Sequence, residues 1–543
     1  MSAPVAFGPQ FDISPPVNST RDHSSVTGLA DGRMVVVWRD LGSNGNEVKL
    51  RILNADGTPA GPERTVGTAT GGTQDNPQIT ALAGGGFAVA WDDFSQGFGN
   101  VRTRVYDETG TAITAERSAH TNTTGSQQDA SIAATADGGF VIGWWDSNIS
   151  VTGLGSNSAG MGRAFDAAGT AAGGAVRISG NWGGDYGPVF AFRGSIGIAV
   201  WDDDLGPDQT RNGEDGIYAR LLDGGLPSGA VADGGQRVDT GAFREVGRNP
   251  DVAIVALGAA VVWEDRPGNA TTSDIYLSRD GNNVSRVNTK TTGNQTDAHV
   301  TALRDGSFVV VWSDSGAADG GDVRARVFDT NGVATSADFR VTAAGAASAG
   351  VQLAPDVTAL ADGRFVVTWV DPQGSTGVQG RIFDPRTGAV NLIGTGHGDQ
   401  FWGTGFGDTI KGGLGADVLH GQAGADRLNG GAGLDTLTGG AGADSFIFAL
   451  AAGAANVDRI VDFTSTRDKI VLENAIFTGL GTSLTASELR FGTAAQDGND
   501  RLIYNAATGR LFFDADANGN GSQRLLAVLD IGTVLAATDF GLI

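Results

Sequence analysis

The sequence predicts an all-β protein in which a seven-bladed β-propeller is followed by a parallel β-roll and a C-terminal β cap. Two internal repeats predict this architecture. A unit marked by Trp-x-Asp occurs seven times before residue 390, and a nonapeptide occurs six times without insertion between Gly394 and Phe448. Repeats of these two lengths are typical of propeller blades and of β-rolls. We therefore expect a propeller at residues 1–390, a roll at 394–448 and a cap at 449–543.

The longer repeat has an interval of 49 to 62 residues, which is enough for four short strands. Its second strand is apolar on consecutive residues, as in Phe365–Trp369, so both faces of that strand should be buried. An Asp-Gly pair often precedes this strand and favours a tight hairpin. The tryptophans are Trp38, Trp91, Trp144, Trp201, Trp263, Trp312 and Trp369. The aspartates two residues later are Asp40, Asp93, Asp146, Asp203, Asp265, Asp314 and Asp371.

The two ends of this region suggest how the ring closes. The seventh unit runs into the nonapeptides with little room for an outer strand, while residues 7–13 form an outer-strand-like segment without a unit of its own. We expect this segment to complete the seventh blade, since closure removes exposed sheet edges. The alternative is a string of separate β-sandwich modules, for which each unit is short.

The residues that recur in every unit are expected to be scaffold. Tryptophan would fill the space between blades. Arginine of the third strand would stack on it or pair with a carboxylate. These arginines are Arg104, Arg163, Arg220, Arg326 and Arg381.

The nonapeptide has the chemistry of a cation site. Nine residues make half a turn of a flattened parallel coil, and the large apolar residue two places after each aspartate should point inward. Glycine permits the unusual backbone of the turn. Stacked turns then bring aspartate oxygens and backbone carbonyls around a hard cation, which fits calcium. The alternative is a flexible glycine linker, which requires no periodic aspartate and apolar pair.

The predicted calcium ligands follow from this register. The aspartates are Asp399, Asp408, Asp417, Asp426, Asp435 and Asp444. The turn glycines are Gly413, Gly415, Gly424, Gly431, Gly433, Gly440 and Gly442, whereas position 422 is Gln422 instead of glycine. The first two copies have threonine in second place and glycine in third and fifth, so their loops fit the pattern less well.

The last four copies resemble the repeats-in-toxin (RTX) nonapeptide G-G-x-G-x-D-x-U-x, where U is a large apolar residue. The Trp-x-Asp units are similar to repeats of large bacterial RTX-type calcium-binding proteins. Residues 457–473 resemble the segment that caps RTX rolls, and the terminal ATDFGLI is similar to signals of type I secretion substrates. The resemblance implies calcium as the cofactor, a type I secretion transporter as a partner and a secreted or cell-surface location in a bacterium. It also implies that the chain folds on calcium after export.

Composition agrees with that expectation. With 61 acidic and 37 basic residues, the formal net charge of -24 disfavours nucleic acid and anionic membranes as partners. There is no cysteine, which excludes disulfides and thiol nucleophiles. No apolar run has the length of about 18 residues that a membrane span needs, so we expect no membrane insertion. The first residues lack the features of an N-terminal secretion signal.

Two classes of function remain open. No H-E-x-x-H, G-x-S-x-G or Walker motif is present, so the sequence names no catalytic or organic-cofactor residue. This favours a non-catalytic extracellular protein that is structural, surface-layer-like or adhesive, and that binds a cell-surface glycan or itself. The alternative is a secreted polysaccharide hydrolase or lyase with its site in the propeller funnel. Loops 147–161 and 202–216 are candidate binding loops. A funnel cluster of acidic residues or histidines from single-copy positions would favour the enzyme.

Overall fold

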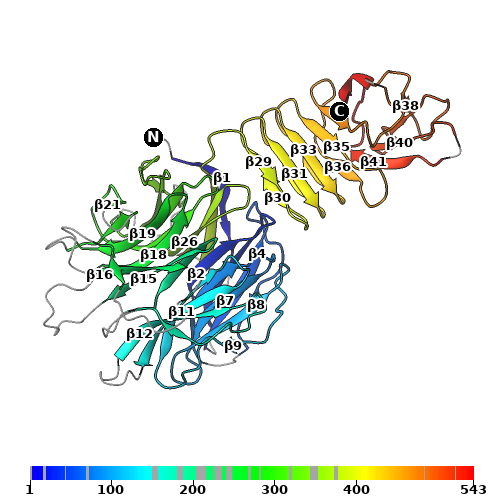
Figure 1. The fold of residues 1–543 in the computed structure, drawn as a ribbon. Helices are drawn as coiled ribbons and strands as arrows, with labels where there is room; N and C mark the ends of the chain where they lie inside the picture. Colours follow the sequence, from blue (N-terminus) through cyan, green and yellow to red (C-terminus); the bar gives the residue numbers. More distant parts are fainter. Residues whose placement is uncertain are drawn as a thin grey trace. The chain divides into compact units, whose positions relative to one another are not determined.

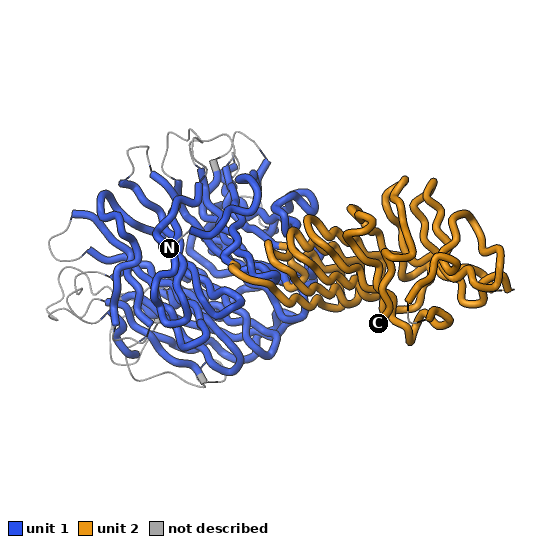
Figure 2. Tube along the Cα trace, turned by 90° about the horizontal axis from the view of Figure 1, so that it is seen from above, with its two compact units in different colours: residues 1–29, 34–385 blue, residues 30–33, 386–543 orange. Residues whose placement is uncertain are grey.

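The structure is a computed structural model whose regular secondary structure is almost entirely β-strand. It describes residues 3–543 except 16–19, 43–44, 69–71, 150–156, 180–186, 204–215, 224–225, 227–234, 240–246, 267–270, 280–282, 317–320, 343–351, 372–376, 482 and 520. The chain divides into two compact units, residues 1–29 with 34–385 and residues 30–33 with 386–543 (Figure 2). The one helical element among the described residues is the short 3-10 turn η1, Ala537–Asp539. No described helix has the length and apolar character to cross a membrane.

The first unit contains seven four-stranded antiparallel sheets, which confirms the predicted seven-bladed propeller (Figure 1). Blade one is β2 (Thr20–Gly28), β3 (Met34–Gly42), β4 (Gly45–Leu53) and β5 (Arg64–Thr65). Blade two is β6 (Gln74–Ala81), β7 (Phe87–Asp93), β8 (Asn100–Tyr106) and β9 (Arg117–Ser118). Blade three is β10 (Gln127–Ala134), β11 (Phe140–Ile149), β12 (Asn157–Phe165) and β13 (Val176–Arg177). Blade four is β14 (Val189–Arg193), β15 (Ile196–Asp203), β16 (Gly216–Asp223) and β17 (Gln236–Arg237).

The last three blades follow the same order. Blade five is β18 (Arg248–Val255), β19 (Gly258–Asp265), β20 (Asp274–Ser278) and β21 (Val284–Arg286). Blade six is β22 (Gln295–Ala302), β23 (Phe308–Asp314), β24 (Asp322–Phe328) and β25 (Phe339–Arg340). Blade seven is β26 (Leu353–Ala359), β27 (Phe365–Asp371), β28 (Gly377–Asp384) and the N-terminal strand β1 (Val5–Asp12), which pairs antiparallel with β28.

The seven repeated tryptophans are fully buried, because each lies between its own blade and the preceding one. Trp91 of blade two, for example, packs in one cluster with Val37 and Val48 of blade one. Removing such a side chain leaves a large cavity and typically costs about 3–5 kcal/mol. The tryptophans are therefore the apolar filling of the ring.

The repeated arginines tie neighbouring blades together. Arg104 donates from Nη1 to the carbonyl of Val66 in the preceding blade at 3.0 Å, and Arg326 donates likewise to Val287 at 2.6 Å. Each guanidinium also lies over the aromatic ring two residues later, 5.8 Å from the Tyr106 centroid in the first case. Stacking on the repeated tryptophan is found at Arg220, which lies over Trp201. The expected stacking partner was therefore wrong for most copies, since the next inward-facing position of the same strand supplies the ring.

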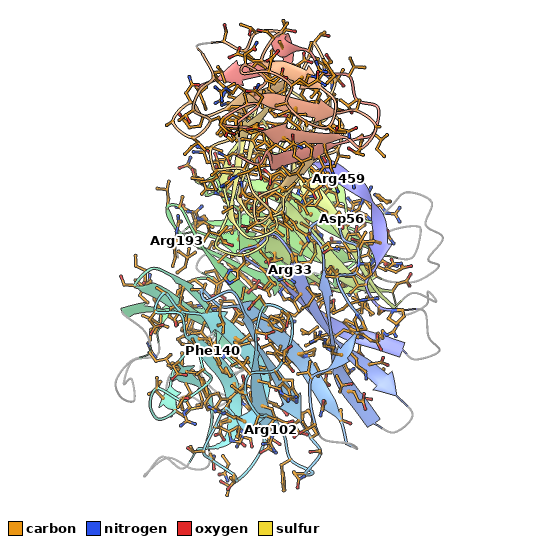
Figure 3. The ribbon with its side chains drawn as sticks, turned by 90° about the vertical axis from the view of Figure 1, so that its right-hand side faces the viewer. Arg33, Asp56, Arg102, Phe140, Arg193 and Arg459 are labelled. Carbon is orange, nitrogen blue, oxygen red and sulfur yellow. The ribbon has the colours of Figure 1, made fainter. Side chains whose placement is uncertain are left out.

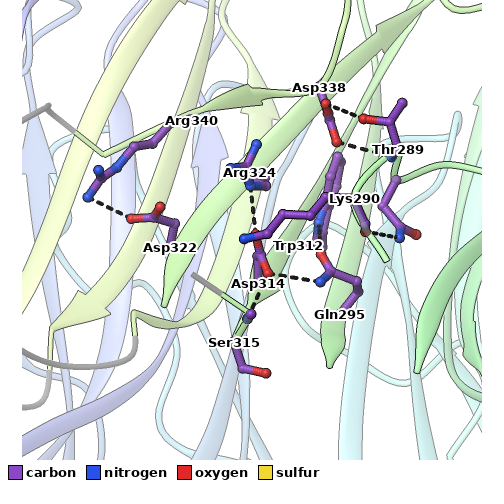
Figure 4. A network of polar contacts seen from close by, with 12 residues as sticks. Thr289, Lys290, Gln295, Trp312, Asp314, Ser315, Asp322, Arg324, Asp338 and Arg340 are labelled. Carbon is purple, nitrogen blue, oxygen red and sulfur yellow. Dashed lines mark hydrogen bonds and ion pairs between the residues drawn. The ribbon is translucent and has the colours of Figure 1, made fainter. Parts of the chain in front are cut away.

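Three of the repeated aspartates, Asp93, Asp146 and Asp314, cap the turn that follows them, because each accepts the backbone N–H two residues later. Asp314 accepts hydrogen bonds from Gln295 Nε2 at 2.9 Å, Lys290 Nζ at 2.9 Å and Arg324 Nε at 2.8 Å (Figure 4). The other amide atom of Gln295, Oε1, accepts from the indole of Trp312 at 2.8 Å. In blade two, Asp93 pairs with Arg102 at 3.2 Å, and Figure 3 shows Arg102 in the propeller. These contacts support a scaffold role for the repeat.

The second unit contains the parallel roll, in which alternate nonapeptides contribute strands to two different sheets. One sheet is ordered β29 (Asn391–Ile393), β31 (Thr409–Leu414), β33 (Arg427–Ala432), β35 (Ser445–Phe448), β37 (Lys469–Leu472) and β42 (Phe540–Leu542). The other begins with β30 (Gln400–Trp402), β32 (Val418–His420), β34 (Thr436–Thr438) and β36 (Asp458–Ile460). It continues through β41 (Arg524–Leu529), β40 (Arg510–Phe513), β39 (Leu502–Asn505) and β38 (Leu489–Phe491).

The core of the roll is the column of apolar residues that the register predicts. These residues are all buried: Phe401, Ile410, Leu419, Leu428, Leu437 and Phe446. The column does not stop at the sixth nonapeptide, because Ile460 and Ile470 continue it on β36 and β37. Both sheets of the roll therefore extend into the C-terminal segment.

Candidate metal centre

The turns of the last four nonapeptides have the positive-φ backbone conformation that their glycines predict. Positive φ values occur at the second and fourth positions, from 94° at Gly440 to 152° at Gly433 and Gly442. Gln422 also has a positive φ, 81°, although it carries a side chain. A Cβ atom on Gly433 would lie 1.5 Å from the carbonyl oxygen of Gly415, two repeats earlier. Glycine is therefore required both for the backbone conformation and for the close approach of stacked turns.

The aspartates form two ladders, one along each edge of the roll. Oδ1 of Asp417 accepts the backbone N–H of Asp399 at 2.7 Å, and Oδ1 of Asp435 accepts that of Asp417 at 2.9 Å. On the other edge, Asp426 accepts from Asp408 at 2.7 Å. These bonds join turns 18 residues apart, so one oxygen of each carboxylate is used in stacking.

The second carboxylate oxygen, Oδ2, is buried without a hydrogen-bond partner at four of these residues: Asp417, Asp426, Asp435 and Asp444. The first glycine of each turn leaves space for it, since a Cβ on Gly412 would lie 1.9 Å from Oδ2 of Asp417. A buried oxygen of a charged group without a partner is costly. Four such atoms at equivalent positions therefore indicate that something absent from the protein chain completes them.

Electrostatics lead to the same conclusion. Burial, together with the neighbouring aspartates of the ladder, raises the pKa of Asp417 and of Asp426 to about 7. The same two causes raise the pKa of Asp458, which continues the ladder beside Asp435, to about 8. Carboxylates in this environment lose protons readily only when a positive charge is near.

The donor set fits calcium. Calcium takes six to eight oxygen ligands, both carboxylate and carbonyl, in flexible geometry. Among the described residues, no three His, Asp or Glu side chains converge on one point. A site in these turns would therefore need backbone carbonyls in addition to its carboxylate oxygens.

The first two nonapeptides are built differently. Neither threonine in second place has a positive φ, and each folds back onto the aspartate four residues later. Thr395 donates its N–H to Oδ2 of Asp399 at 2.6 Å, and Thr404 donates to Oδ2 of Asp408 at 2.5 Å. The threonine hydroxyls donate to the same carboxylates at 3.0–3.3 Å. That these two loops depart from the nonapeptide pattern is visible in the sequence, but the threonine cap was not predicted.

The propeller brings together charged residues that the sequence left unconnected. His299 of blade six lies between Asp251 of blade five, 3.5 Å from Nδ1, and Asp356 of blade seven, at 3.9 Å. Although burial alone would lower it, these carboxylates raise the pKa of His299 to about 9. His23 similarly lies 3.4 Å from both Asp22 and Asp75.

Other candidates from the sequence have little support or cannot be placed. One is the stretch of residues 514–519, whose D-x-D-x-N-G spacing resembles the start of an EF-hand loop. There Asp516 accepts the N–H of Gly521 at 2.8 Å, so its carboxylate caps a turn. About half of the first candidate binding loop, residues 150–156, and most of the second, residues 204–215, lie outside the described residues.

Comparison with known proteins agrees with the repeats. A family model of the RTX calcium-binding nonapeptide repeat (4 copies) matches residues 393–428, 402–437 and 420–449. No curated protein matches the chain. A solution structure of the AlgE6R3 subunit of the Azotobacter vinelandii mannuronan C5-epimerase is 31% identical, over 28% of this chain and 77% of that chain, with a TM-score of 0.17.

Two other solved structures are similar over the propeller. A Dyadobacter fermentans protein of unknown function is 13% identical, over 71% of this chain and 99% of that chain, with a TM-score of 0.41. The Hadza microbial sialidase Hz136 is 11% identical, over 65% of this chain and 77% of that chain, with a TM-score of 0.39. At these TM-scores the likenesses do not bear on activity.

Proposed function

We propose that this chain, which carries RTX calcium-binding nonapeptide repeats and a seven-bladed β-propeller, is a secreted non-catalytic protein that acts outside the cell. Its role would be structural, surface-layer-like or adhesive. The proposal includes export by a type I secretion transporter through an uncleaved signal in residues 449–543. It also keeps the division into a propeller at 1–390 and a roll at 394–448.

The observation that carries the proposal is the set of four buried, unpartnered Oδ2 atoms in the roll. Asp417, Asp426, Asp435 and Asp444 would hold calcium through these atoms. Carbonyls of the turn glycines would supply further oxygens: Gly413, Gly415, Gly424, Gly431, Gly433, Gly440 and Gly442. When bound, calcium would compensate the buried negative charge.

Calcium binding is then coupled to folding, because the ligands come together only in the stacked roll. Extracellular calcium modules have dissociation constants of about 10⁻⁴–10⁻³ M. At the much lower calcium of the cytosol the roll would stay unfolded, which suits passage through a transporter. The net charge of -24 opposes collapse of the chain until calcium binds.

The test is the assembly state of the purified full chain with millimolar calcium and with chelator, followed by light scattering and electron microscopy. Ordered assemblies that require calcium would support a structural or surface-layer-like role. A variant with all four aspartates changed to asparagine is the matched control, and it should not assemble. A calcium-folded monomer that neither assembles nor binds glycans would refute the structural and adhesive role.

A second candidate function, a polysaccharide hydrolase or lyase, is favoured by the charged residues of three adjacent blades. His299, Asp251 and Asp356 stand at the equivalent position of three adjacent blades, each opposite the residue before the repeated tryptophan, so a histidine there lies between two carboxylates. However, Oδ2 of Asp251 also accepts the N–H of Val300 in the next blade at 2.8 Å, and Oδ2 of Asp356 accepts that of Val26 at 2.8 Å. These bonds join neighbouring blades, which also fits a structural ion pair.

The enzyme hypothesis can be tested with a panel of acidic and neutral polysaccharides. Products would be detected as new reducing ends or as unsaturated sugars. Activity that is lost in His299→Gln while the propeller remains folded would establish the enzyme. Activity of equal size in the wild type and this variant would place the reaction elsewhere.

A further inference from the structure

We infer that the six nonapeptides are of two kinds, and that the first two form a calcium-independent start of the roll in which Thr395 and Thr404 take the place of the metal. The calcium row would then be confined to the four turns of Asp417, Asp426, Asp435 and Asp444. This inference rests on the proposed function, because it assumes that the open turns bind calcium. It narrows the set of six aspartates that the sequence predicts as ligands.

The two kinds of turn differ in what completes the carboxylate. In the open turns, Oδ2 is buried and without a partner. In the closed turns, the N–H and the hydroxyl of one threonine both donate to the aspartate, at 2.6 and 3.2 Å for Oδ2 of Asp399. Hydrogen bonds to a charged acceptor are about twice as strong as neutral ones. A closed turn therefore satisfies its carboxylate without a cation.

The backbone differs in the same way. In the open turns, the residues at the second and fourth positions have positive φ. In the closed turns, none of the residues at these positions, Thr395, His397, Thr404 and Phe406, has a positive φ. The closed turns thus lack both the unpartnered carboxylate oxygen and the positive-φ backbone of the open ones.

The same threonine cap recurs past the last nonapeptide. Thr464 donates its N–H to Oδ2 of Asp468 at 2.7 Å, again across four residues. Oδ1 of Asp468 accepts the N–H of Asp444 at 3.2 Å and so continues that ladder. On this edge of the roll, a closed turn therefore lies at each end and the open turns of Asp426 and Asp444 lie between them.

A Thr-x-x-x-Asp cap thus marks the end of the run of calcium-binding turns. The closed turns that it stabilises need no cation, so they can form at calcium concentrations that leave the open turns empty. The open turns then stack on a rung that already exists. The costly first step of roll formation is therefore separated from calcium binding.

The test is calcium titration calorimetry on the full chain, with paired variants. Asp399→Asn with Asp408→Asn should leave the number of bound ions unchanged, because the open turns keep all their ligands. Asp417→Asn with Asp426→Asn should lower the number of bound ions and shift the calcium midpoint at least tenfold. Equal losses of bound calcium in the two double variants would overturn the inference. If the wild type bound no calcium at these turns, the proposed function itself would fail.

A second measurement on the wild type avoids the risk that a variant fails to fold. Amide hydrogen exchange in chelator should be slower in residues 394–411 than in residues 412–448, and added calcium should protect mainly the latter. Uniformly fast exchange over both segments in chelator, followed by equal protection with calcium, would show that the first two turns also need the metal.

Discussion

Substituting Asp426 should change the stability of the roll in opposite directions with and without calcium, so it tests calcium dependence directly. Asparagine in its place keeps an oxygen that can accept the N–H of Asp408, now at 2.7 Å, but loses the negative charge. Without calcium, the charged carboxylate destabilises the roll because Oδ2 is buried and unpartnered. With calcium, the same carboxylate is a ligand of the ion. We expect Asp426→Asn to stabilise the calcium-free roll and to destabilise the calcium-loaded one.

The stabilisation of the calcium-free roll by Asp426→Asn can be worked out from the pKa of Asp426. Burial, with the charges of Asp444 and Asp408, raises the pKa of Asp426 to about 7 from an ordinary value of 3.8. Because the folded value is the higher one, the stability that the protonated group confers is full below pH 3.8 and is lost as pH rises through about 7. Each pKa unit is worth about 1.4 kcal/mol. At pH 8 the ionised carboxylate therefore costs the calcium-free roll on the order of 4 kcal/mol, which is the upper limit of the gain from asparagine.

The assay is urea unfolding of the full chain at pH 5 and pH 8, with chelator or with calcium, followed by hydrogen exchange in residues 412–448. In chelator the variant should be more stable than the wild type at pH 8, and its advantage should fall to less than half at pH 5, because most of the interval between pH 3.8 and about 7 lies above pH 5. Asp408→Asn is the matched control, because Thr404 donates two hydrogen bonds to that carboxylate, and it should lower stability in both conditions. Destabilisation by Asp426→Asn in chelator at pH 8 would refute the reasoning.

Three further predictions concern the turns and the propeller. Gly433→Ala should prevent the roll from folding even at high calcium, because φ is 152° and the new Cβ would meet Gly415 O at 1.5 Å. Gly453→Ala is the control, since its Cβ would have nothing within 4 Å, and it should be neutral in circular dichroism melts. Gln295→Leu should destabilise the propeller by about 2–4 kcal/mol in chelator, since Trp312 and Asp314 both lose a buried partner; an unchanged urea midpoint would contradict this. His299→Gln should reduce the pH dependence of propeller unfolding between pH 6.5 and about 9. Asp251, Asp356 and Asp297 raise the folded pKa of His299, so the wild type loses stability as pH rises through that range. Parallel pH profiles of the two proteins would contradict this.

The sequence predicts well whatever depends on chain periodicity. The inward column that includes Leu419 and Leu428 lies where the nine-residue register places it, and the tryptophans lie between blades as expected. The threonine caps were not predicted, because a hydrogen bond across four residues depends on the φ of Thr395 and not on its identity alone. The rungs at Asp458 and Asp468 were missed because longer connections interrupt the nonapeptide there, although Asp-x-Ile persists in both.

The charged contacts around His299 were not predictable for another reason. Their partners are 48 and 57 residues away and meet only when the ring is closed, so no local pattern marks them. The absence of known catalytic motifs gave no information about them either.

The pairing of β1 with β28 has a consequence for how copies of the protein can interact. Blade seven is the one blade whose outer strand comes from the opposite end of the propeller sequence, with Val5 opposite Asp384. A strand joined to the rest of the ring only through one connecting segment can leave its place without unfolding a blade. The vacated edge of β28 then accepts the same strand from a second molecule. The ring closure that hides the sheet edge within one molecule thus also provides a route to domain-swapped dimers.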